Sequence, residues 1–327
     1  LEFRRVLFRS GREMAVPDDP IGALHLHVDE PRHYDAWNID RDYLERREVL
    51  DRADSVTVEE SAIVVHRTFG ESAVTLRWTM PADDARLDLR VDVDWYETRK
   101  LLKVTWPLDL RAPHVTAGVQ LGVQHRALHE NTSWEQARYE DWFHGFVHTA
   151  EGSFGAAVVT AGAHGYDATS RVRTDGGTTT ALRISLVRAP MYPDPLCDRG
   201  HHTIDLSLLV GADLAAATTA AARARTSLIP GGAVTGLAPV AVVDGHGVQT
   251  MAVKLADDDS GDIVVRVAEV LGGRTVASIV TSVAVADAVR CDLLEEPVGD
   301  DEALAGQSLS VHLRPFEVAT YRLRVAR

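Results

Sequence analysis

Alternation of apolar and polar residues is the dominant pattern along the chain. Leu87, Leu89, Val91, Val93 and Trp95 alternate with charged residues, and this period of two predicts a strand with one buried face. Further strands are predicted at 61–69, 73–80, 101–106, 119–123, 154–160, 181–187, 248–255, 263–270, 275–285 and 309–313. Many strands without regularly interspersed helices favour an all-β fold, with antiparallel sheets packed as a sandwich.

Two segments favour helix instead. Residues 212–225 are rich in alanine, the strongest helix former, although an alanine-rich connection between two sheets is an alternative. A short helix is also expected within 40–52. Pro230, Gly231 and Gly232 follow the alanine-rich segment and mark a domain boundary. We therefore expect one domain over 14–229 and a second over 230–327.

The amino-terminal segment is unusual in composition. Residues 1–10 read Leu-Glu-Phe-Arg-Arg-Val-Leu-Phe-Arg-Ser, and basic residues interrupt an apolar part that is too short for a signal peptide. Residues 4–10 can be back-translated into the end of a common sequencing adapter. We hypothesise that residues 1–13 are an artefact at the edge of a truncated reading frame; a native basic arm is the alternative.

Composition and charge narrow the classes of partner. The chain has 327 residues and a formal net charge of −14, which argues against nucleic acid or an anionic membrane surface, because both require basic patches. No apolar run approaches the roughly 18 residues of a membrane span. Cys197 and Cys291 have neither the spacing of a zinc site nor that of a disulfide framework, so a reducing, cytoplasmic location is expected.

A polar loop after the strand at 181–187 is the strongest local candidate for a site. Residues 189–202 contain three prolines and a concentration of charged and imidazole groups, and such loops often carry function. Arginine offers a fork of donors that suits vicinal hydroxyls or a carboxylate. The candidate site residues are Arg199, Asp198, Asp194 and His201. The alternative is that Arg199 pairs with Asp194 or Asp198 and merely closes its own loop.

A metal site is a second hypothesis. His25, His27 and Asp29 would share one face of an extended strand, but a polar strand face is the favoured interpretation. His201 and His202 would point to opposite faces if extended. We therefore assign no metal ligand.

An aromatic segment offers a third candidate. Trp134, Tyr139, Trp142 and Phe143 could form a cluster that stacks on sugar rings. A core or interdomain position for these side chains is favoured over a sugar site.

Five segments, in order along the chain, resemble family 38 of the glycoside hydrolases, the retaining zinc α-mannosidases. Residues 35–40 read Asp-Ala-Trp-Asn-Ile-Asp, and residues 93–104 read Val-Asp-Trp-Tyr-Glu-Thr-Arg-Lys-Leu-Leu-Lys-Val. The other three segments are 125–134, 182–202 and 313–323. Tyr34 and Asn38 depart from the family's first motif. The resemblance covers the part of this family that follows its catalytic barrel.

The resemblance implies a large antiparallel β-supersandwich of the galactose-mutarotase kind, followed by a smaller carboxyl-terminal β-sandwich. A retaining glycosidase needs two closely spaced carboxyl groups, and this family adds a zinc ion held by His and Asp. Those residues belong to the barrel, upstream of the segment that matches 35–40. The resemblance therefore implies no catalytic residue and no cofactor in this chain, with zinc belonging to the complete parent enzyme.

The expected function is that of the non-catalytic carboxyl-terminal part of a zinc-dependent retaining α-mannosidase, inactive by itself. Its expected partners are the missing barrel, carbohydrate bound at most weakly, and a further copy of the parent in a homo-oligomer. The loop around Arg199 is expected to approach the barrel. The alternatives are a free-standing carbohydrate-binding β-sandwich and a mutarotase-like epimerase, which could use His125 or His129 with Glu140 as acid and base.

Overall fold

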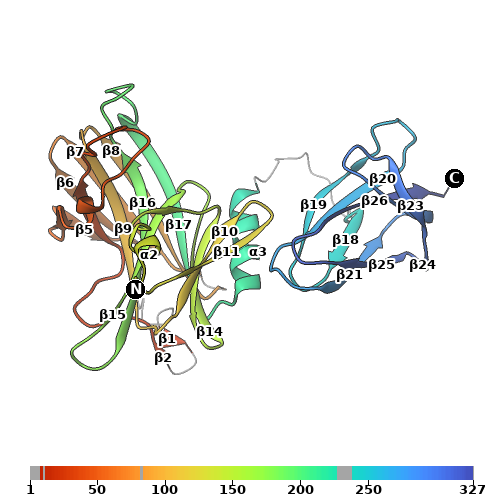
Figure 1. Ribbon diagram of the computed structural model, residues 1–327, viewed down its shortest axis with the longest axis horizontal. Helices are drawn as coiled ribbons and strands as arrows, with labels where there is room; N and C mark the ends of the chain where they lie inside the picture. Colours follow the sequence, from red (N-terminus) through yellow and green to blue (C-terminus); the bar gives the residue numbers. More distant parts are fainter. Residues whose placement is uncertain (1–7, 10–11, 82–83, 227–237, 327) are drawn as a thin grey trace. The chain divides into compact units, whose positions relative to one another are not determined.

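The computed structural model describes residues 8–9, 12–81, 84–226 and 238–326. Strands in antiparallel sheets account for most of the ordered elements (Figure 1). The chain divides into two compact units. The large unit comprises the described residues up to Gly118 together with Gln124–Thr226, and the small unit comprises Val119–Val123 and the described residues after 237.

Two sheets form the large domain. In spatial order, the first contains β11 (Gly122–Ala127), β10 (His114–Val119), β13 (Phe146–Glu151), β14 (Phe154–Thr160), β17 (Gly200–Val210), β8 (Arg86–Trp95), β7 (Ser72–Thr79), β6 (Ala62–Phe69) and β5 (Ser55–Val58). The second contains β12 (Asp141–Trp142), β15 (Gly165–Val172), β16 (Thr178–Arg188), β9 (Lys100–Leu108), β3 (Ala23–Val28) and β4 (Arg47–Leu50). A two-stranded ribbon joins β1 (Phe8–Arg9) to β2 (Arg12–Glu13).

The core lies between the nine-stranded and six-stranded sheets. The predicted alternation in β8 is confirmed, because Leu89, Val91 and Trp95 are buried in this core while Arg90 and Asp94 are exposed. The facing strands contribute their own apolar residues: Leu24, Leu102, Val104, Trp106, Leu182 and Ile184. Burial of this apolar surface is the main force that holds the two sheets together.

The described residues also form three helical elements: η1 (Arg41–Leu44), α2 (Ser133–Gln136) and α3 (Leu214–Arg225). The helix predicted in the alanine-rich segment is confirmed by α3, which begins where the Asp213 carboxylate accepts a hydrogen bond of 2.8 Å from the Ala216 amide. Ala217 and Ala221 are buried where α3 packs against β13 and β14. None of the described helices combines the length and hydropathy that a membrane crossing requires.

The short helix expected within 40–52 is present as the 3₁₀ helix η1, which is followed by strand β4. Two other local predictions need correction. The predicted strand at 119–123 instead covers the turn between β10 and β11, where Leu121 has a φ of 56°. The single strand predicted at 275–285 is two strands, β21 (Thr275–Thr281) and the start of β22 (Val285–Cys291), which belong to different sheets.

The small unit is a β-sandwich of its own. One sheet has the order β18 (Ala241–Asp244), β21, β25 (Ser308–Leu313) and β24 (Leu304–Ala305). The other has the order β19 (Val248–Leu255), β20 (Ile263–Glu269), β26 (Val318–Val325), β22 and β23 (Pro297–Glu302). Val265, Ile279 and Tyr321 are among the residues of its separate core.

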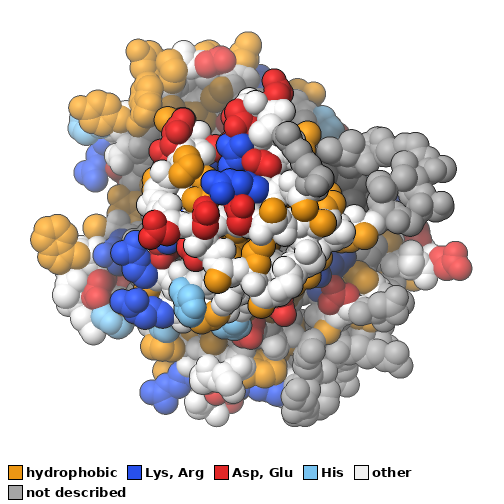
Figure 2. All heavy atoms as spheres, turned by 90° about the vertical axis from the view of Figure 1, so that its right-hand side faces the viewer, with side chains coloured by type: hydrophobic (Ala, Val, Ile, Leu, Met, Phe, Trp, Pro, Cys, Tyr) orange, Lys and Arg blue, Asp and Glu red, His pale blue; other side chains and the backbone are white. Residues whose placement is uncertain are grey.

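Most Lys and Arg side chains on the small unit pair with a carboxylate. Arg322 forms ion pairs of 2.7 Å with Asp258 and 2.8 Å with Asp262, and Arg324 lies 2.8 Å from Asp287. Figure 2 shows acidic and basic side chains intermingled on the face that it draws. Such mixing gives little of the concentrated positive charge that attracts nucleic acid.

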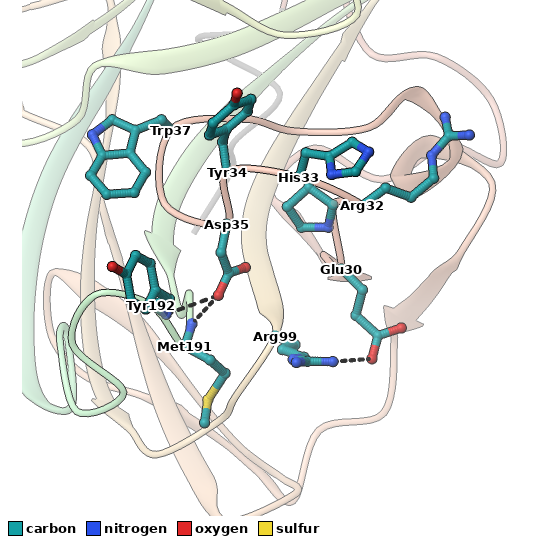
Figure 3. A pocket seen from close by; sticks show the side chains of 10 residues that line it. Glu30, Arg32, His33, Tyr34, Asp35, Trp37, Arg99, Met191 and Tyr192 are labelled. Carbon is teal, nitrogen blue, oxygen red and sulfur yellow. Dashed lines mark hydrogen bonds and ion pairs between the residues drawn. The ribbon is translucent and has the colours of Figure 1, made fainter.

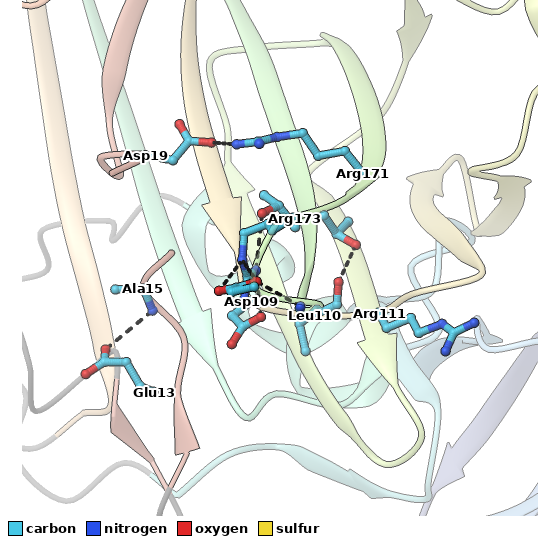
Figure 4. Close-up of polar contacts among 12 residues, drawn as sticks. Glu13, Ala15, Asp19, Asp109, Leu110, Arg111, Arg171 and Arg173 are labelled. Carbon is cyan, nitrogen blue, oxygen red and sulfur yellow. Dashed lines mark hydrogen bonds and ion pairs between the residues drawn. The ribbon is translucent and has the colours of Figure 1, made fainter. Parts of the chain in front are cut away.

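The segment that leads into β3 is fastened to the large unit. Met14 is fully buried, and Arg12 pairs with Glu151 at 2.9 Å. Asp19 contacts Arg171 at 2.6 Å, as Figure 4 shows. Residues 1–7 and 10–11 lie outside the described residues, so the hypothesis that 1–13 is an artefact stays a prediction.

The six-stranded sheet carries a layer of buried polar groups on the face that points away from the core. The Lys103 ammonium, on β9, lies 2.5 Å from both the Glu140 and the Asp167 carboxylates. Arg183 donates to Asp167 at 2.6 Å, and the Tyr43 hydroxyl donates to Glu140 at 2.7 Å. Burial alone would raise the pKa of Asp167, but the neighbouring Lys103 and Arg183 outweigh it and hold that pKa below its usual range.

Two histidines of β3 belong to the same layer. His25 is 8% exposed and His27 is fully buried, and their ring centroids are 6.0 Å apart. The His27 Nδ1 atom lies 2.9 Å from the Tyr43 carbonyl oxygen. Desolvation is the main reason why the pKa of each imidazole falls from 6.5 to about 4. Both rings are therefore neutral at physiological pH.

This layer predicts acid sensitivity. The unfolded chain binds these two protons near pH 6.5 and the folded chain only near pH 4, so the free energy of unfolding should fall as pH drops through that window. The expected loss is about 1–3 kcal/mol per histidine. Urea denaturation at pH 7 and pH 5 measures it. His25→Gln/His27→Gln should flatten the dependence, whereas His312→Gln, at an exposed position of the small unit, should not. An unchanged slope in the double variant contradicts the assignment.

Candidate functional site

The loops that follow β3 and β16 enclose a hollow of about 440 Å³ on the large unit. We call it the aromatic hollow. Figure 3 shows the residues that line it, which are Glu30, Pro31, Arg32, His33, Tyr34, Asp35, Trp37, Arg99, Met191 and Tyr192. Three segments that are distant in the sequence, residues 30–37, Arg99 and residues 191–192, therefore build one site.

The guanidinium of Arg188, the last residue of β16, holds the first loop in place. It donates to the carbonyl oxygens of Ala36 at 3.1 Å and Asp35 at 3.0 Å, and also to that of Asn38. It forms an ion pair with the carboxylate of Asp29, which is 1% exposed. Burial raises the pKa of the Asp29 carboxyl, although Arg188 opposes that shift. One planar cation thus satisfies a buried charge and three backbone acceptors.

A carboxylate from the first loop holds the second. Asp35 Oδ2 accepts hydrogen bonds from the backbone amides of Met191 at 2.6 Å and Tyr192 at 2.9 Å (Figure 3). Ala189, which follows Arg188, exchanges backbone hydrogen bonds with the start of β9: Arg99 donates to it at 2.7 Å, and it donates to Lys100 at 2.9 Å. The two loops and the start of β9 are therefore held together by both side-chain and backbone contacts.

Aromatic side chains stand on the rim of the hollow. Tyr34 is 77% exposed, Trp37 is 69% exposed and Tyr192 is 65% exposed. The rings of Trp37 and Tyr192 have centroids 6.2 Å apart and are tilted by 59°. Exposed aromatic groups on a fixed scaffold are typical of surfaces that bind a sugar ring or another protein. The charged groups nearby pair with one another, as in the ion pair of 3.6 Å between Arg99 and Glu30.

The residues predicted from the proline-rich loop lie beside this hollow in the sequence but do not line it. Asp194, Asp198 and Arg199 are exposed. Asp194 accepts a hydrogen bond of 2.9 Å from the Leu196 amide, and Asp198 has a φ of 62°. His201 lies on β17, where its Nδ1 atom is 2.9 Å from Asp94. The structure does not bring the four predicted side chains together around one point.

Arg199 does not close its own loop. Within the described part of the chain its guanidinium makes no hydrogen bond and no ion pair, so the proposed closure by Asp194 or Asp198 is wrong. Its exposed donors remain available to a group outside the chain. Its assignment as a site residue stays a prediction.

The described residues do not fit the zinc ion that the family resemblance implies. His25 and His27 do share one strand face, as expected, but Asp29 pairs with Arg188 and His27 Nδ1 faces the Tyr43 carbonyl. No group of three or more His, Cys, Asp or Glu side chains among the described residues is arranged to hold a metal. The favoured interpretation, a polar strand face, matches the geometry, although that face is buried.

The predicted aromatic cluster is not formed. Phe143 is fully buried against Tyr166, whereas Trp134 is 80% exposed on α2 and Trp142 is 45% exposed. Tyr139 donates through its hydroxyl to the Ile39 carbonyl at 2.9 Å. Among the described residues no ring contact joins any two of the four side chains.

The acid–base pair proposed for an epimerase is not formed either. His125 contacts Thr116 at 2.8 Å, and His129 lies 3.1 Å from Glu135. The Glu140 carboxylate is occupied by Tyr43 and Lys103 in the buried polar layer. In the part of the chain that the structure describes, neither histidine contacts Glu140.

Sequence reasoning named Asp29 and the segment 35–40 but did not identify the contacts that join them into the aromatic hollow. Arg188 and Asp29 are 159 positions apart, so no local pattern joins them. One signal was present: the two family-like segments 35–40 and 182–202 each supply a loop to this site. An inference that these two family-like segments lie side by side in the fold would have identified the hollow.

Two family models match the chain. Residues 6–196 match the model described as "Glycosyl hydrolases family 38 C-terminal domain". Residues 247–321 match "Glycosyl hydrolases family 38 C-terminal beta sandwich domain". The first match includes every residue that lines the aromatic hollow.

Individual relatives extend the comparison. The chain is 29% identical over 337 aligned residues to mouse "Alpha-mannosidase 2C1", with 97% of the chain and 31% of that protein covered. It is 26% identical to "Alpha-mannosidase" of Saccharomyces cerevisiae, with 91% and 30% covered. The chain thus spans about three tenths of the length of these curated relatives.

Solved structures share the fold. An α-mannosidase from Enterococcus faecalis V583 superposes with a TM-score of 0.68 at 16% identity, over 92% of this chain and 38% of that one. A family 38 protein from the same species gives a TM-score of 0.66 at 15% identity. With the first family model matching more than half of the residues, the chain belongs to glycoside hydrolase family 38 and corresponds to its carboxyl-terminal β domains.

Proposed function

We propose that the chain is the non-catalytic carboxyl-terminal region of a zinc-dependent retaining α-mannosidase, which hydrolyses terminal α-mannosides. The family membership and the partial coverage of its relatives support this reading. The catalytic carboxyl groups and the zinc ligands would lie in an upstream region. The role of the present domains would be to pack against that region and complete the rim of its substrate pocket.

The aromatic hollow is the observation that carries the proposal. Arg188 and Asp35 fix its two loops, yet Tyr34, Trp37 and Tyr192 remain largely exposed to water. A scaffold that is ordered in advance loses less entropy when a partner binds. Exposed rings held in this way suit a surface that meets another domain, a sugar, or both.

A free-standing carbohydrate-binding domain is the second candidate function. The neighbouring Trp37 and Tyr192 rings support it, because an aromatic face can stack on the apolar side of a sugar. The two candidates differ in what the isolated chain binds: the domain proposal expects at most weak sugar binding, and the second candidate expects mannoside binding without any partner.

The first prediction from this proposal concerns activity. The 327-residue chain should release no nitrophenol from 4-nitrophenyl α-mannoside, with or without added zinc, because the groups that attack and protonate the glycoside lie elsewhere. The same domains joined to the catalytic region of their own gene should be active. Turnover by the chain alone that a chelator abolishes contradicts the proposal.

The second prediction concerns the two arginines of the site. Arg188→Lys keeps a charge but loses the planar fork, so one ammonium cannot serve the Asp29 carboxylate and all three carbonyl groups, and the free energy of unfolding should fall by about 1–3 kcal/mol. Arg199→Lys is the matched control, and it should change stability by less than about 0.5 kcal/mol because the residue is exposed and unpaired. Urea denaturation measures both. Equal losses in the two variants would show that Arg188 is not the residue that holds the loops.

The third prediction concerns the rim. Trp37→Ala should reduce binding of a hydrophobic dye to the isolated chain, because it removes a ring that is 69% exposed beside Tyr192. Trp134→Ala removes a ring that is 80% exposed on α2 and serves as the control. Dye fluorescence titrations compare the two. If both variants reduce dye binding equally, the aromatic hollow is not the preferred contact surface.

A further inference from the structure

A second hollow of about 350 Å³ opens between the margins of the two sheets of the large unit. We call it the mouth hollow. Its wall includes Arg67 and Phe69 of β6, Leu50 of β4 and Lys100 at the start of β9. It is separate from the aromatic hollow, and none of the residues predicted from the sequence lines it.

Arg67 points inward. Val65 and Phe69, which precede and follow it by two positions, pack on the core, and side chains two positions apart share one face of a strand. Its cross-strand neighbour Val74 is 1% exposed. Arg67 is thus a cation on the apolar side of the nine-stranded sheet, at the place where that side opens into the mouth hollow.

The donors of Arg67 are not satisfied by the protein. Its Nε and Nη1 atoms are buried and have no hydrogen-bond partner among the described residues. Desolvation lowers the pKa of this guanidinium, against the opposing effect of Asp51 and Asp54. Because buried donors are nearly always paired, an acceptor from outside the chain that enters the mouth hollow would relieve this unfavourable arrangement.

Lys100 supplies a second cation from the facing sheet. Leu102 and Val104 belong to the core, so Lys100 lies on the same face of β9, at its open end. Its ammonium makes no ion pair or hydrogen bond in the described ranges. Two unpartnered cations therefore approach the mouth hollow from opposite sheets.

The nearby carboxylates form no direct ion pair with either cation among the described residues, although Asp51 and Asp54 act on Arg67 through space. Asp54 accepts hydrogen bonds from the Thr68 amide at 2.6 Å and hydroxyl at 2.8 Å. Glu97 accepts from the Glu71 amide and the Ser72 hydroxyl, both at 3.0 Å. Glu48 and Asp51 are exposed and form no ion pair with either cation within the described residues.

We propose that the mouth hollow binds a carboxylate between Arg67 and Lys100. The charge-assisted hydrogen bonds would satisfy the guanidinium, and Phe69 and Leu50 would contact the apolar part of the ligand. The surrounding carboxylates favour an acid with one negative charge over a dianion such as phosphate. The carboxylate comes either from a free organic acid or from an Asp or Glu side chain of another protein segment.

Thermal unfolding and titration calorimetry of the full chain at constant ionic strength test the proposal. Sodium glucuronate represents a free acid, N-acetyl-glutamate amide represents a protein side chain, and phosphate is the contrasting anion. At least one carboxylate should bind and raise the Tm, and phosphate should bind about tenfold more weakly or not at all. The tighter of the two carboxylates identifies the source. Binding should weaken as salt is added.

Variants separate a binding role from a structural one. Arg67→Met should raise the Tm of the ligand-free chain, because an unpaired buried cation is removed, and should abolish binding. Lys100→Gln should weaken binding about tenfold or more with little effect on Tm. Arg199→Gln, at an exposed arginine without a partner, should bind like the unaltered chain.

Several outcomes would overturn the proposal. One is that no carboxylate binds at about 50 mM ligand, a concentration high enough to detect a Kd in the millimolar range. The others are that phosphate binds as tightly as a carboxylate, or that Lys100→Gln leaves binding unchanged. A lower Tm in Arg67→Met would assign the residue a structural role instead. If that variant does not fold, Arg67→Lys and Lys100→Gln decide the question through the affinity alone.

Discussion

Burial of β9, an inner strand of the six-stranded sheet, on both of its faces is the constraint on which the large domain depends. On β9, Leu102 belongs to the apolar core while Lys103, pointing the other way, is also fully buried. Water reaches neither face of this strand, so a charge on its outer face must find its partner within the protein. Lys103 does so between Asp167 and Glu140. The segment around Glu140 and the turn that contains Tyr43 are thereby fastened to the sheet by charge and hydrogen bonds.

The same constraint positions the aromatic hollow. β9 lies between β16 and β3 in the sheet, and the loops that leave these two flanking strands meet beyond its end. Asp29 is buried there, and an unpaired carboxylate at that depth would be strongly destabilising. Arg188 removes the penalty and in doing so binds the backbone of the neighbouring loop. The loops of the site are held in place because one buried charge, that of Asp29, has to be compensated.

Local sequence patterns predicted the parts of the fold that depend on the burial of alternate residues along a strand. The alternation in β8 identified its buried face because one side of that strand meets water and the other meets the core. The predicted strand at 119–123 failed because Leu121, an apolar residue, occupies the left-handed region at a φ of 56° inside a turn. No propensity favours that conformation for leucine.

The candidate sites were harder to predict, since their contacts join distant positions. The three arginines show the difficulty: among the described residues, Arg188 has partners for its donors, Arg67 faces inward with two unpaired donor atoms, and Arg199 is exposed without a partner. Their side chains are chemically identical, so only the surroundings distinguish a residue that holds a loop from one that awaits a ligand. The sequence pointed to Arg199 because of its polar neighbours, and it gave no sign of Arg67.

The two hollows share one short segment of backbone. Arg99 lines the aromatic hollow and Lys100, the next residue, lines the mouth hollow. Both are fixed by Ala189, through the amide of Arg99 at 2.7 Å and the carbonyl of Lys100 at 2.9 Å. A substitution that shifts this segment therefore disturbs both walls, whatever role its side chain plays. For that reason Arg199, which lies outside both walls, is a sound control for Arg67, and Arg99 is not.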